Sequence, residues 1–373
     1  MDELPRHYPV MLAESLEYLA IRPDGRYLDC TCGLGGHTAA IAARLTAGGK
    51  VISCDRDAQS LEMAERNTAE FHDRIEFRQA NFSEIAESNL DGLIADLGVS
   101  RYQLTSAERG FSFMAEGPLD MRMDQSRGMT AADLLNHSAE KAIAGWLHQY
   151  GEERRARKIA GAIVRARPIR STLHLAGVVE RAAPRTGPLH PATRTFMALR
   201  MVVNREQEEL DALLERAPRM MRPGGRIVII SFMSLEDRKV KESFRELKRT
   251  GRASILTKKP LTPGAQEVRE NPPSRSAKLR AVEIANHQPD VNEEQERNGH
   301  TGSEANAHNG PYGLCAYIQS AKQHRERLAR RMGARRRRRD HGGRGNGGRD
   351  RRRHVRIAGT AQRLHLLLLE EDR

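Results

Sequence analysis

The sequence predicts an α/β fold in which a block of helices interrupts an open parallel sheet. A short apolar segment, a glycine turn, a helix-forming stretch and a second apolar segment follow one another over residues 27–55. Two further apolar segments, at residues 74–77 and 90–98, each end in polar side chains. Residues 130–215 then lack a strand pattern, and an apolar segment returns at 226–231.

The stretch at residues 27–55 has the form of the first half of a nucleotide-binding βαβ unit. Its turn reads Gly33-x-Gly35-Gly36, and glycines let the backbone approach a ligand where a Cβ would collide. Asp55 ends the second strand, where a carboxylate accepts hydrogen bonds from two ribose hydroxyls. Asp29 would repel a pyrophosphate but suits a cation. The turn therefore favours S-adenosylmethionine over NAD, and a nucleotide-type turn for some other ligand is the alternative.

The next two strands end in the same way. Residues 74–77 lead to Asn81-Phe82-Ser83, and residues 90–98 contain Asp96 near their end. Ligands of open parallel sheets bind beyond the carboxyl ends of the strands. We therefore expect four side chains to meet at one edge of the sheet: Asp29, Asp55, Phe82 and Asp96.

The strand-free stretch is predicted to be helical. Thr130 and Ser138 are expected to cap helices, and Gly151 and Pro168 are expected to end them. Many of its arginines are predicted on one side, where they would bind nucleic-acid phosphates, although for any single arginine a solvated helix face is the alternative. These are Arg154, Arg155, Arg157, Arg165, Arg167 and Arg170.

The α/β pattern resumes after the helical stretch. A turn at residues 222–225 leads into the apolar strand at 226–231. A helix is expected around residues 235–249, and two last strands at 253–257 and 278–284.

The positive charge of the chain is concentrated near its end. The formal net charge is +13, yet residues 321–356 alone hold 16 Lys and Arg against 3 Asp and Glu. The rest of the chain is close to neutral, so it would have to bind a nucleic acid through local patches of positive charge. Residues 287–373 are predicted to be a low-complexity, arginine-rich and disordered tail.

The cysteines indicate a reducing compartment. Cys30, Cys32, Cys54 and Cys315 form no C-x-x-C pair and show no zinc spacing, so no metal site is expected. The first residues do not resemble a signal peptide, and no apolar run is long enough to span a bilayer. The sequence therefore predicts a cytoplasmic protein without a membrane partner.

Several longer blocks occur in order along the chain: His7, Asp29-x-Thr31-x-Gly33-x-Gly35-Gly36-His37, Asp55-Arg56-Asp57, Asp96-Leu97-Gly98-Val99-Ser100, Glu108-Arg109-Gly110-Phe111-Ser112-Phe113, Gly117-Pro118-Leu119-Asp120-Met121-Arg122-Met123, Tyr150-Gly151-Glu152-Glu153, His190-Pro191-Ala192-Thr193-Arg194-Thr195-Phe196 and Ser231-Phe232-x-Ser234-Leu235-Glu236-Asp237-Arg238. Together they resemble the bacterial 16S ribosomal RNA (cytosine-N4)-methyltransferases, and the resemblance covers about residues 6–286.

This resemblance implies a class I, Rossmann-like methyltransferase sheet with an inserted all-α domain. The cofactor domain would comprise residues 1–105 and 216–286, and the substrate-recognition domain residues 106–215. S-adenosyl-L-methionine would be the donor, and the target a cytosine N4 amine in the decoding centre (P site) of 16S rRNA within the small ribosomal subunit. The chain departs from the family pattern at Met233, where His is usual, at Arg101, where a second Ser is usual, and after residue 286.

Carried over position by position, the resemblance implies that the cofactor contacts are Gly35, Gly36, His37, Asp55, Phe82, Asp96 and Gln103. Gly35 and Gly36 would admit the methionine portion, Asp55 would hold the ribose, and Phe82 and Asp96 would flank the adenine. For His37 a capping role is an equal alternative. For Gln103 the alternative is a solvated loop amide.

The catalytic group and the oligomeric state stay open at this stage. Candidates for orienting the cytosine amine are Asp96, Asp120 and the main chain of residues 97–99. The alternatives to this function are a non-enzymatic RNA-binding protein that keeps the fold and a methyltransferase acting on another nucleic acid.

Overall fold

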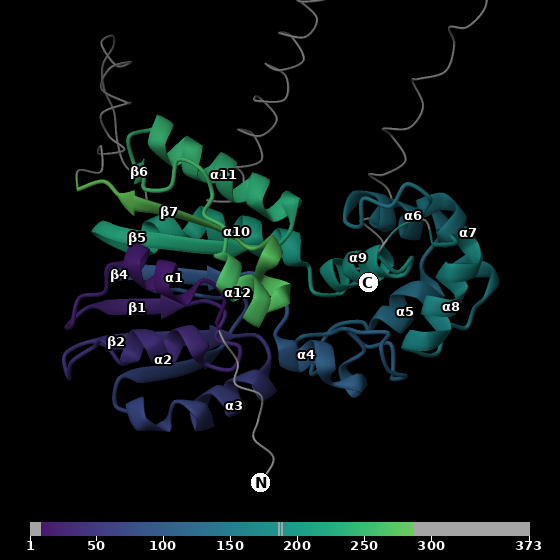
Figure 1. The fold of residues 1–373 in the computed structure, drawn as a ribbon, viewed down its shortest axis with the longest axis horizontal. Coiled ribbons are helices and arrows are strands. Elements are labelled where there is room, and N and C mark those ends of the chain that lie inside the picture. Colours follow the sequence, from purple (N-terminus) through teal and green to yellow (C-terminus); the bar gives the residue numbers. More distant parts are fainter. Residues whose placement is uncertain (1–8, 186, 188, 287–373) are drawn as a thin grey trace, which may run out of the picture. The chain divides into compact units, whose positions relative to one another are not determined.

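The computed structural model describes residues 9–185, 187 and 189–286, so the predicted tail lies outside the described residues, as do His7 and Cys315. Within the described part, one seven-stranded sheet has the order β3-β2-β1-β4-β5-β7-β6 (Figure 1). The predicted α/β class and strands are confirmed. The strands are β1 (Arg26–Asp29), β2 (Lys50–Asp55), β3 (Ile75–Gln79), β4 (Leu90–Asp96), β5 (Met221–Ser231), β6 (Ala253–Ile255) and β7 (Lys278–Ile284).

The strand order places a ligand crevice next to β1. Strands β1 to β5 pair in parallel, and β7 runs antiparallel to both β5 and β6. Strand β1 lies between β2 and β4, so the chain winds outward in one direction to β3 and then crosses over to β4. Such a switch point leaves a crevice beyond the carboxyl ends of the two strands, where open α/β sheets bind their ligands.

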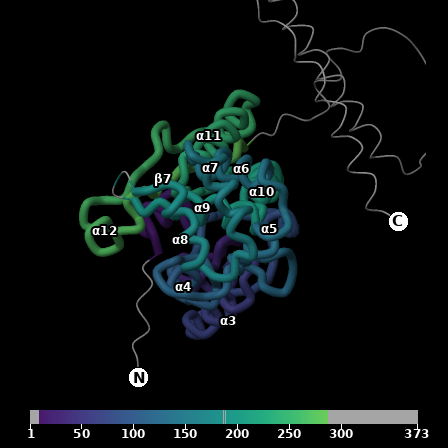
Figure 2. The backbone as a smooth tube through the Cα atoms, turned by 90° about the vertical axis from the view of Figure 1, so that its right-hand side faces the viewer, coloured from purple at the N-terminus to yellow at the C-terminus, as the bar shows by residue number. Residues whose placement is uncertain are grey.

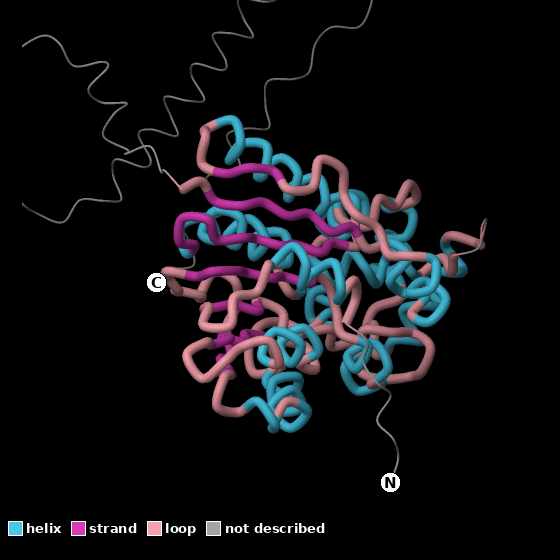
Figure 3. The backbone as a smooth tube through the Cα atoms, turned by 60° about the vertical axis from the view of Figure 1, so that its left-hand side comes forward, coloured by secondary structure: helices cyan, strands magenta, loops and turns pink. Residues whose placement is uncertain are grey.

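Helices lie on both faces of the sheet (Figure 3), and side chains that alternate along the strands are buried beneath them. Leu93 and Ile227 belong to one apolar cluster, while their neighbours Ile94 and Val228 belong to another, as the two-residue period of a strand requires. The first cluster includes residues of α10 (Glu206–Met220) and α11 (Ser234–Arg249). The second includes residues of α1 (Leu12–Leu19) and α2 (Gly36–Ala42). Each face is thus covered by helices, as the almost wholly buried strands demand.

The helical block has its own core. Its helices are α5 (Ala131–His137), α6 (Glu140–Gln149), α7 (Ala156–Arg165), α8 (Thr172–Ala182) and α9 (Thr193–Val203), drawn in blue to teal in Figures 1 and 2. A separate cluster of buried apolar side chains runs from Phe111 to Leu199 and shares no buried member with the clusters of the sheet. The predicted absence of strands at 130–215 is confirmed for the described residues.

Local boundaries differ from the expectation in two places. Thr130 caps α5 through a reciprocal pair of hydrogen bonds with Asp133, as predicted, but Ser138 ends α5, and Ala139 is the N-cap of α6. The predicted turn at residues 222–225 belongs to β5, which begins at Met221. A register shift between Leu90 and Gly92 on β4 accommodates this glycine-containing segment within the ladder.

Other short elements were not expected from the sequence. They are η1 (Ala69–Phe71), α4 (Arg101–Thr105), η2 (Ala107–Arg109), α12 (Ala265–Glu270) and η3 (Pro272–Ser276). Helix α3 spans Ala58–Asn67 and directly precedes η1. None of the described helices is long and apolar enough to cross a membrane. All described residues fall in one compact unit, Met1–Asn298, so the division of the chain at residues 105, 215 and 286 stays a prediction.

Candidate cofactor site

Asp29, Asp55 and Asp96 end the adjacent strands β1, β2 and β4, so the expected gathering of carboxylates at one edge is present. The Asp55 carboxylate accepts a hydrogen bond from the Gly33 amide at 2.8 Å and one from the Asp57 amide at 2.9 Å. Burial raises the pKa of Asp55 to about 6, although these two amides oppose the shift. The loop after β2 and the glycine turn are therefore joined at this carboxylate.

Asp29 stabilises the glycine turn at residues 33–36 from the interior of the protein. It is fully buried, and its carboxylate accepts hydrogen bonds from the Thr38 hydroxyl at 2.7 Å and the Thr31 amide at 3.0 Å. The Thr38 hydroxyl also lies 2.6 Å from the Ser53 hydroxyl on β2. Burial raises the pKa of Asp29 to about 6. Because Asp29 has no exposed surface and both its oxygens accept hydrogen bonds from the chain, it would act on a bound cation through its charge alone.

The three glycines of the turn have different surroundings. A Cβ on Gly35, whose φ is +88°, would lie 2.9 Å from the Thr68 side chain, and one on Gly36 would lie 3.1 Å from Pro9. A Cβ on Gly33, whose φ is +51°, would meet nothing within 4 Å. Packing and backbone conformation thus account for glycine at 35 and 36. The open space lies at Gly33, a motif residue that the sequence interpretation did not assign to the cofactor.

His37 lies in the first turn of α2, as predicted, and is almost fully buried. Its Nε2 donates a hydrogen bond to the Val10 carbonyl at 3.1 Å. Burial lowers the pKa of His37 to about 4, so the ring is neutral at pH 7. This geometry favours the structural role of His37, which ties the segment before α1 to α2.

Asp96 offers an acceptor that the described part of the chain leaves unused. Its amide donates to the Thr31 hydroxyl at 2.7 Å, whereas its Oδ1 is buried and has no hydrogen-bond partner among the described residues. Burial, and then the charge of Asp29, raise the pKa of Asp96 well above its usual range. A buried acceptor without a donor is costly. This side chain therefore fits a ligand that brings a donor or a positive charge.

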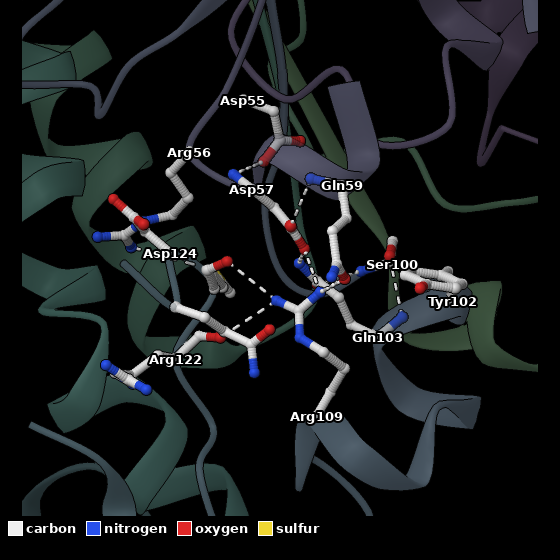
Figure 4. A network of polar contacts seen from close by, with 12 residues as sticks. Asp55, Arg56, Asp57, Gln59, Ser100, Tyr102, Gln103, Arg109, Arg122 and Asp124 are labelled. Carbon is white, nitrogen blue, oxygen red and sulfur yellow. Dashed lines mark hydrogen bonds and ion pairs between the residues drawn. The ribbon is translucent and has the colours of Figure 1, made fainter. Parts of the chain in front are cut away.

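Phe82 lies on the loop after β3, whereas Gln103, which was expected on a loop after Asp96, lies in α4. Phe82 follows β3 and packs, partly buried, against the apolar cluster of α10 and α11. Gln103 is 4% exposed, and both ends of its amide are used: Nε2 donates to Asp57 Oδ2 at 2.7 Å, and Oε1 accepts from the Ser100 amide at 3.0 Å (Figure 4). The structure therefore places Gln103 against the loop that follows Asp55.

These residues fit an adenosine-bearing cationic donor. Asp55 supplies a partly buried carboxylate at the end of β2, Gly33 leaves space beside it, and Asp96 holds an unpaired acceptor at the end of β4. In the described ranges, no group of three or more His, Cys, Asp or Glu side chains is placed to hold a metal ion.

A second feature is a basic cleft in the helical block, with a volume of about 920 Å³. Arg155 donates to the main-chain carbonyl of Pro184, and Arg194 donates to that of Glu152. Because a carbonyl carries no negative charge, these bonds do not neutralise the two guanidinium groups. Of the predicted arginines, Arg167 instead donates to carbonyls at the end of α5 and supports the fold. The charged and imidazole side chains of the cleft are His148, Glu152, Glu153, Arg154, Arg155, Arg185, His190 and Arg194.

Met233, where the resemblance leads one to expect His, lies at the start of α11. Its sulfur is 3.8 Å from an Arg200 nitrogen, and Arg200 forms a two-pronged ion pair with Glu206 at 2.8 Å for both contacts. The Glu236 carboxylate accepts hydrogen bonds from the Phe232 and Met233 amides at 3.2 and 3.1 Å. The side chain at 233 therefore borders a buried, charged cluster just beyond the carboxyl end of β5, whose Ile230 pairs with Asp96 of β4.

Two relatives of this chain have the same name. A relative from Solibacter usitatus (strain Ellin6076), "Ribosomal RNA small subunit methyltransferase H", is 62% identical over 285 residues, which cover 74% of this chain and 99% of that protein. A relative of the same name from Koribacter versatilis (strain Ellin345) is 49% identical over 291 residues, covering 74% of this chain and 93% of that protein.

Among solved structures, a SAM-dependent O-methyltransferase from Thermotoga maritima aligns with a TM-score of 0.38 and 11% identity over 78% of this chain and 70% of that one. The model of the MraW methylase family matches residues 5–285, which leaves the predicted tail outside the match. S-adenosylmethionine as the methyl donor agrees with this methylase assignment and with the carboxylate edge. The chain belongs to the MraW methylase family.

Proposed function

We propose that this protein transfers the methyl group of S-adenosylmethionine to the N4 amine of one cytosine in the decoding centre (P site) of 16S rRNA, with the small ribosomal subunit or its RNA as substrate. The observation that carries the proposal is the 62% identity to a small-subunit rRNA methyltransferase over 99% of that relative's length. We propose cytosine as the base and N4 as the methylated atom because the sequence blocks resemble those of cytosine-N4 methyltransferases.

The cofactor residues that we propose fall into two groups. Asp55 at the end of β2 and Phe82 beyond the end of β3 would contact the adenosine, and Gly33 would let it approach the turn, while Asp96 at the end of β4 would face the cofactor from the other side of β1. Gly35, Gly36, His37 and Gln103 would shape the site from behind, because their polar atoms or Cβ positions are taken up by the chain. When bound, S-adenosylmethionine supplies a methyl group that is already activated on a sulfonium.

The chain must then prepare the cytosine amine. Its lone pair is delocalised into the ring, so an acceptor for an amine hydrogen would help to localise it, with the nitrogen held in line about 3–3.5 Å from the methyl carbon. The Asp120 carboxylate is occupied by Arg122, at 2.7 and 3.0 Å. Asp96 has the unpaired oxygen. Among the candidates, we propose Asp96 as the acceptor.

The basic cleft of the helical block is the proposed binding site for the phosphate backbone of the RNA. Arg154 and Arg194 are exposed there, and a guanidinium that bonds only to carbonyls keeps its charge for phosphate. A body with little net charge needs such a local patch. Extraction of the target base from its surroundings would accompany docking.

The direct test is mass spectrometry of nucleosides from 16S rRNA of cells with and without this gene. N4-methylated cytidine at the decoding centre should be lost in the deletion strain. It should return with the intact gene and with Asp73→Ala, an exposed carboxylate outside the site, but not with Asp55→Ala. Persistence of the modification in the deletion strain would overturn the proposal.

A second measurement separates this function from the alternatives. The purified protein should methylate small subunits or 16S rRNA when supplied with labelled S-adenosylmethionine. Calorimetric titration that detects no S-adenosylmethionine binding would instead support a non-enzymatic RNA-binding protein. Labelling of DNA or another RNA, with 16S rRNA left unlabelled, would place the substrate elsewhere.

A further inference from the structure

Arg109 is the most deeply buried arginine among the described residues, with 1% of its surface exposed. It ends η2, on the segment that leads from the sheet into the helical block. Its guanidinium forms an ion pair with Asp57 at 2.8 Å and donates to Gln59 Oε1 at 3.1 Å. It also donates to the Met123 carbonyl at 2.9 Å. Figure 4 shows Arg109 together with Asp57 and Gln59. A buried charge with this many partners fixes the relative position of the groups that it joins.

The Asp57 end of this contact belongs to the cofactor edge. Asp57 caps α3 by accepting from the Gln59 amide at 3.2 Å, and its own amide donates to the Asp55 carboxylate at 2.9 Å. Gln103 donates to the same Asp57 oxygen that faces Arg109. A shift of Asp55 would therefore be transmitted to Arg109 through a single intervening residue.

The Met123 end belongs to the attachment of the helical block. The Met123 amide donates to Asn204 Oδ1 at 2.8 Å, and Asn204 Nδ2 donates to the Met121 carbonyl at 2.7 Å. Asn204 is the residue at which α9 ends and the chain leaves the block. Arg56, next to Asp55, donates to the Asn204 carbonyl at 2.7 Å. Both chain connections of the block are thus held against the loop 55–57.

We infer that Arg109 is a positioning residue that couples occupancy of the Asp55 site to the binding of RNA by the helical block. This inference rests on the proposed function for the identity of the two ligands. The contacts run from Asp55 through Asp57 and Arg109 to residues 122–123. An adenosine ligand that fixes the geometry of the loop 55–57 would therefore also fix the position of the helical block. Arg109 would contact neither ligand.

The quantity to measure is the ratio of the RNA dissociation constants without and with S-adenosylhomocysteine. The full-length protein and the small ribosomal subunit would be used at fixed salt. The ratio should be about fivefold or more in the unchanged protein, within the usual range of coupling between two sites. It should fall to about 1 in Arg109→Met and in the double variant Arg109→Met/Asp57→Asn.

The double variant guards against a trivial loss of folding. It removes both members of the buried ion pair, a replacement that proteins often tolerate well, whereas removal of one partner leaves a buried charge. Asn at 57 also keeps a cap for α3. The matched control is Arg226→Met, which breaks the ion pair with Glu283 at the opposite end of the sheet and should keep the full ratio.

The outcomes separate the two proposals. If the unchanged protein binds S-adenosylhomocysteine and the small subunit but shows a ratio of 1, or if the folded double variant keeps the full ratio, the role of Arg109 is refuted and the proposed function stands. An unchanged protein that binds neither ligand refutes both. A ratio lost in the double variant and kept in Arg226→Met supports the inference, because a merely structural residue would lower the melting temperature without changing the ratio.

Discussion

The carboxylate edge and the basic cleft present opposite charges in different surroundings. At the edge, Asp29 is buried and Asp55 partly buried, and both accept hydrogen bonds from amide or hydroxyl donors that the chain holds in place. In the cleft, Arg154 and Arg194 are exposed and project from an all-helical scaffold. A buried carboxylate with preset partners favours one small ligand in one orientation. Exposed guanidinium groups suit a long polyanion that is bound with many weak contacts.

The largest expected effect comes from removing the preset acceptor. In Asp55→Ala two ribose hydroxyls lose a charged acceptor, and we expect S-adenosylmethionine binding to weaken by about 3 kcal/mol, as judged from hydrogen bonds to charged groups. Calorimetric titration measures the change, with Asp73→Ala as the control. Unchanged affinity in Asp55→Ala would mean that the adenosine lies elsewhere.

The same edge should respond to pH. Burial raises the pKa of Asp55 to about 6, so the carboxylate is charged above that pH and protonated below it. Affinity for S-adenosylmethionine should therefore fall about tenfold between pH 7 and pH 5, as the ionised fraction falls. Titrations at several pH values test this. Asp55→Asn should flatten the profile, and a wild-type profile that rises toward acid pH would contradict the assignment.

The cleft should show smaller, additive and salt-dependent effects. Arg154→Ala and Arg194→Ala should each weaken binding of the small subunit by about 1 kcal/mol and reduce the salt slope by about 1. Affinity for S-adenosylmethionine should stay the same. Filter binding at several salt concentrations gives both numbers, and Arg66→Ala, on the exposed face of α3, serves as the control. Equal losses in all three variants would remove the cleft from the RNA interface.

The smallest effect is expected at Met233, which lies beside the Arg200–Glu206 pair. In Met233→His the neighbouring guanidinium should keep the imidazole neutral, and turnover should change by less than about twofold. Rates of methyl transfer at pH 6, 7 and 8 decide the matter. A large gain that titrates near neutrality would show proton transfer at this position and extend the reactive edge toward α11.

Local patterns account for what the sequence predicted well. Apolar runs in the sequence predict the strands. An acidic residue at the end of such a run must lie at the edge of the sheet, and for this reason the strand-end positions of Asp29, Asp55 and Asp96 were predicted correctly. The strand-free stretch and the Thr130 cap follow from equally local signals.

Long-range contacts account for what the sequence left open. Arg109 reads like any surface arginine of a charged loop, and only the fold brings it to Asp57 and Met123. The choice of Gly33 over Gly35 as the open glycine depends on Thr68, which lies across the turn on a different element. The bond from Gln103 to Asp57 likewise joins α4 to the start of α3 and is visible only in the fold, whereas its bond with the Ser100 amide follows from the local Ser-x-x-Gln spacing of a capping box.

The hydrogen bonds between Asn204 and residues 121–123 have a consequence for how this architecture is put together. They bring the point where the chain leaves the helical block next to the point where it enters. A module whose two ends are neighbours interrupts its host at one spot, the condition under which domain insertion is tolerated. A linker that replaces the chain between Met123 and Asn204 could therefore be short, but the sheet would also need polar replacements for Phe111, Leu119 and Met121, whose core partners such a linker removes.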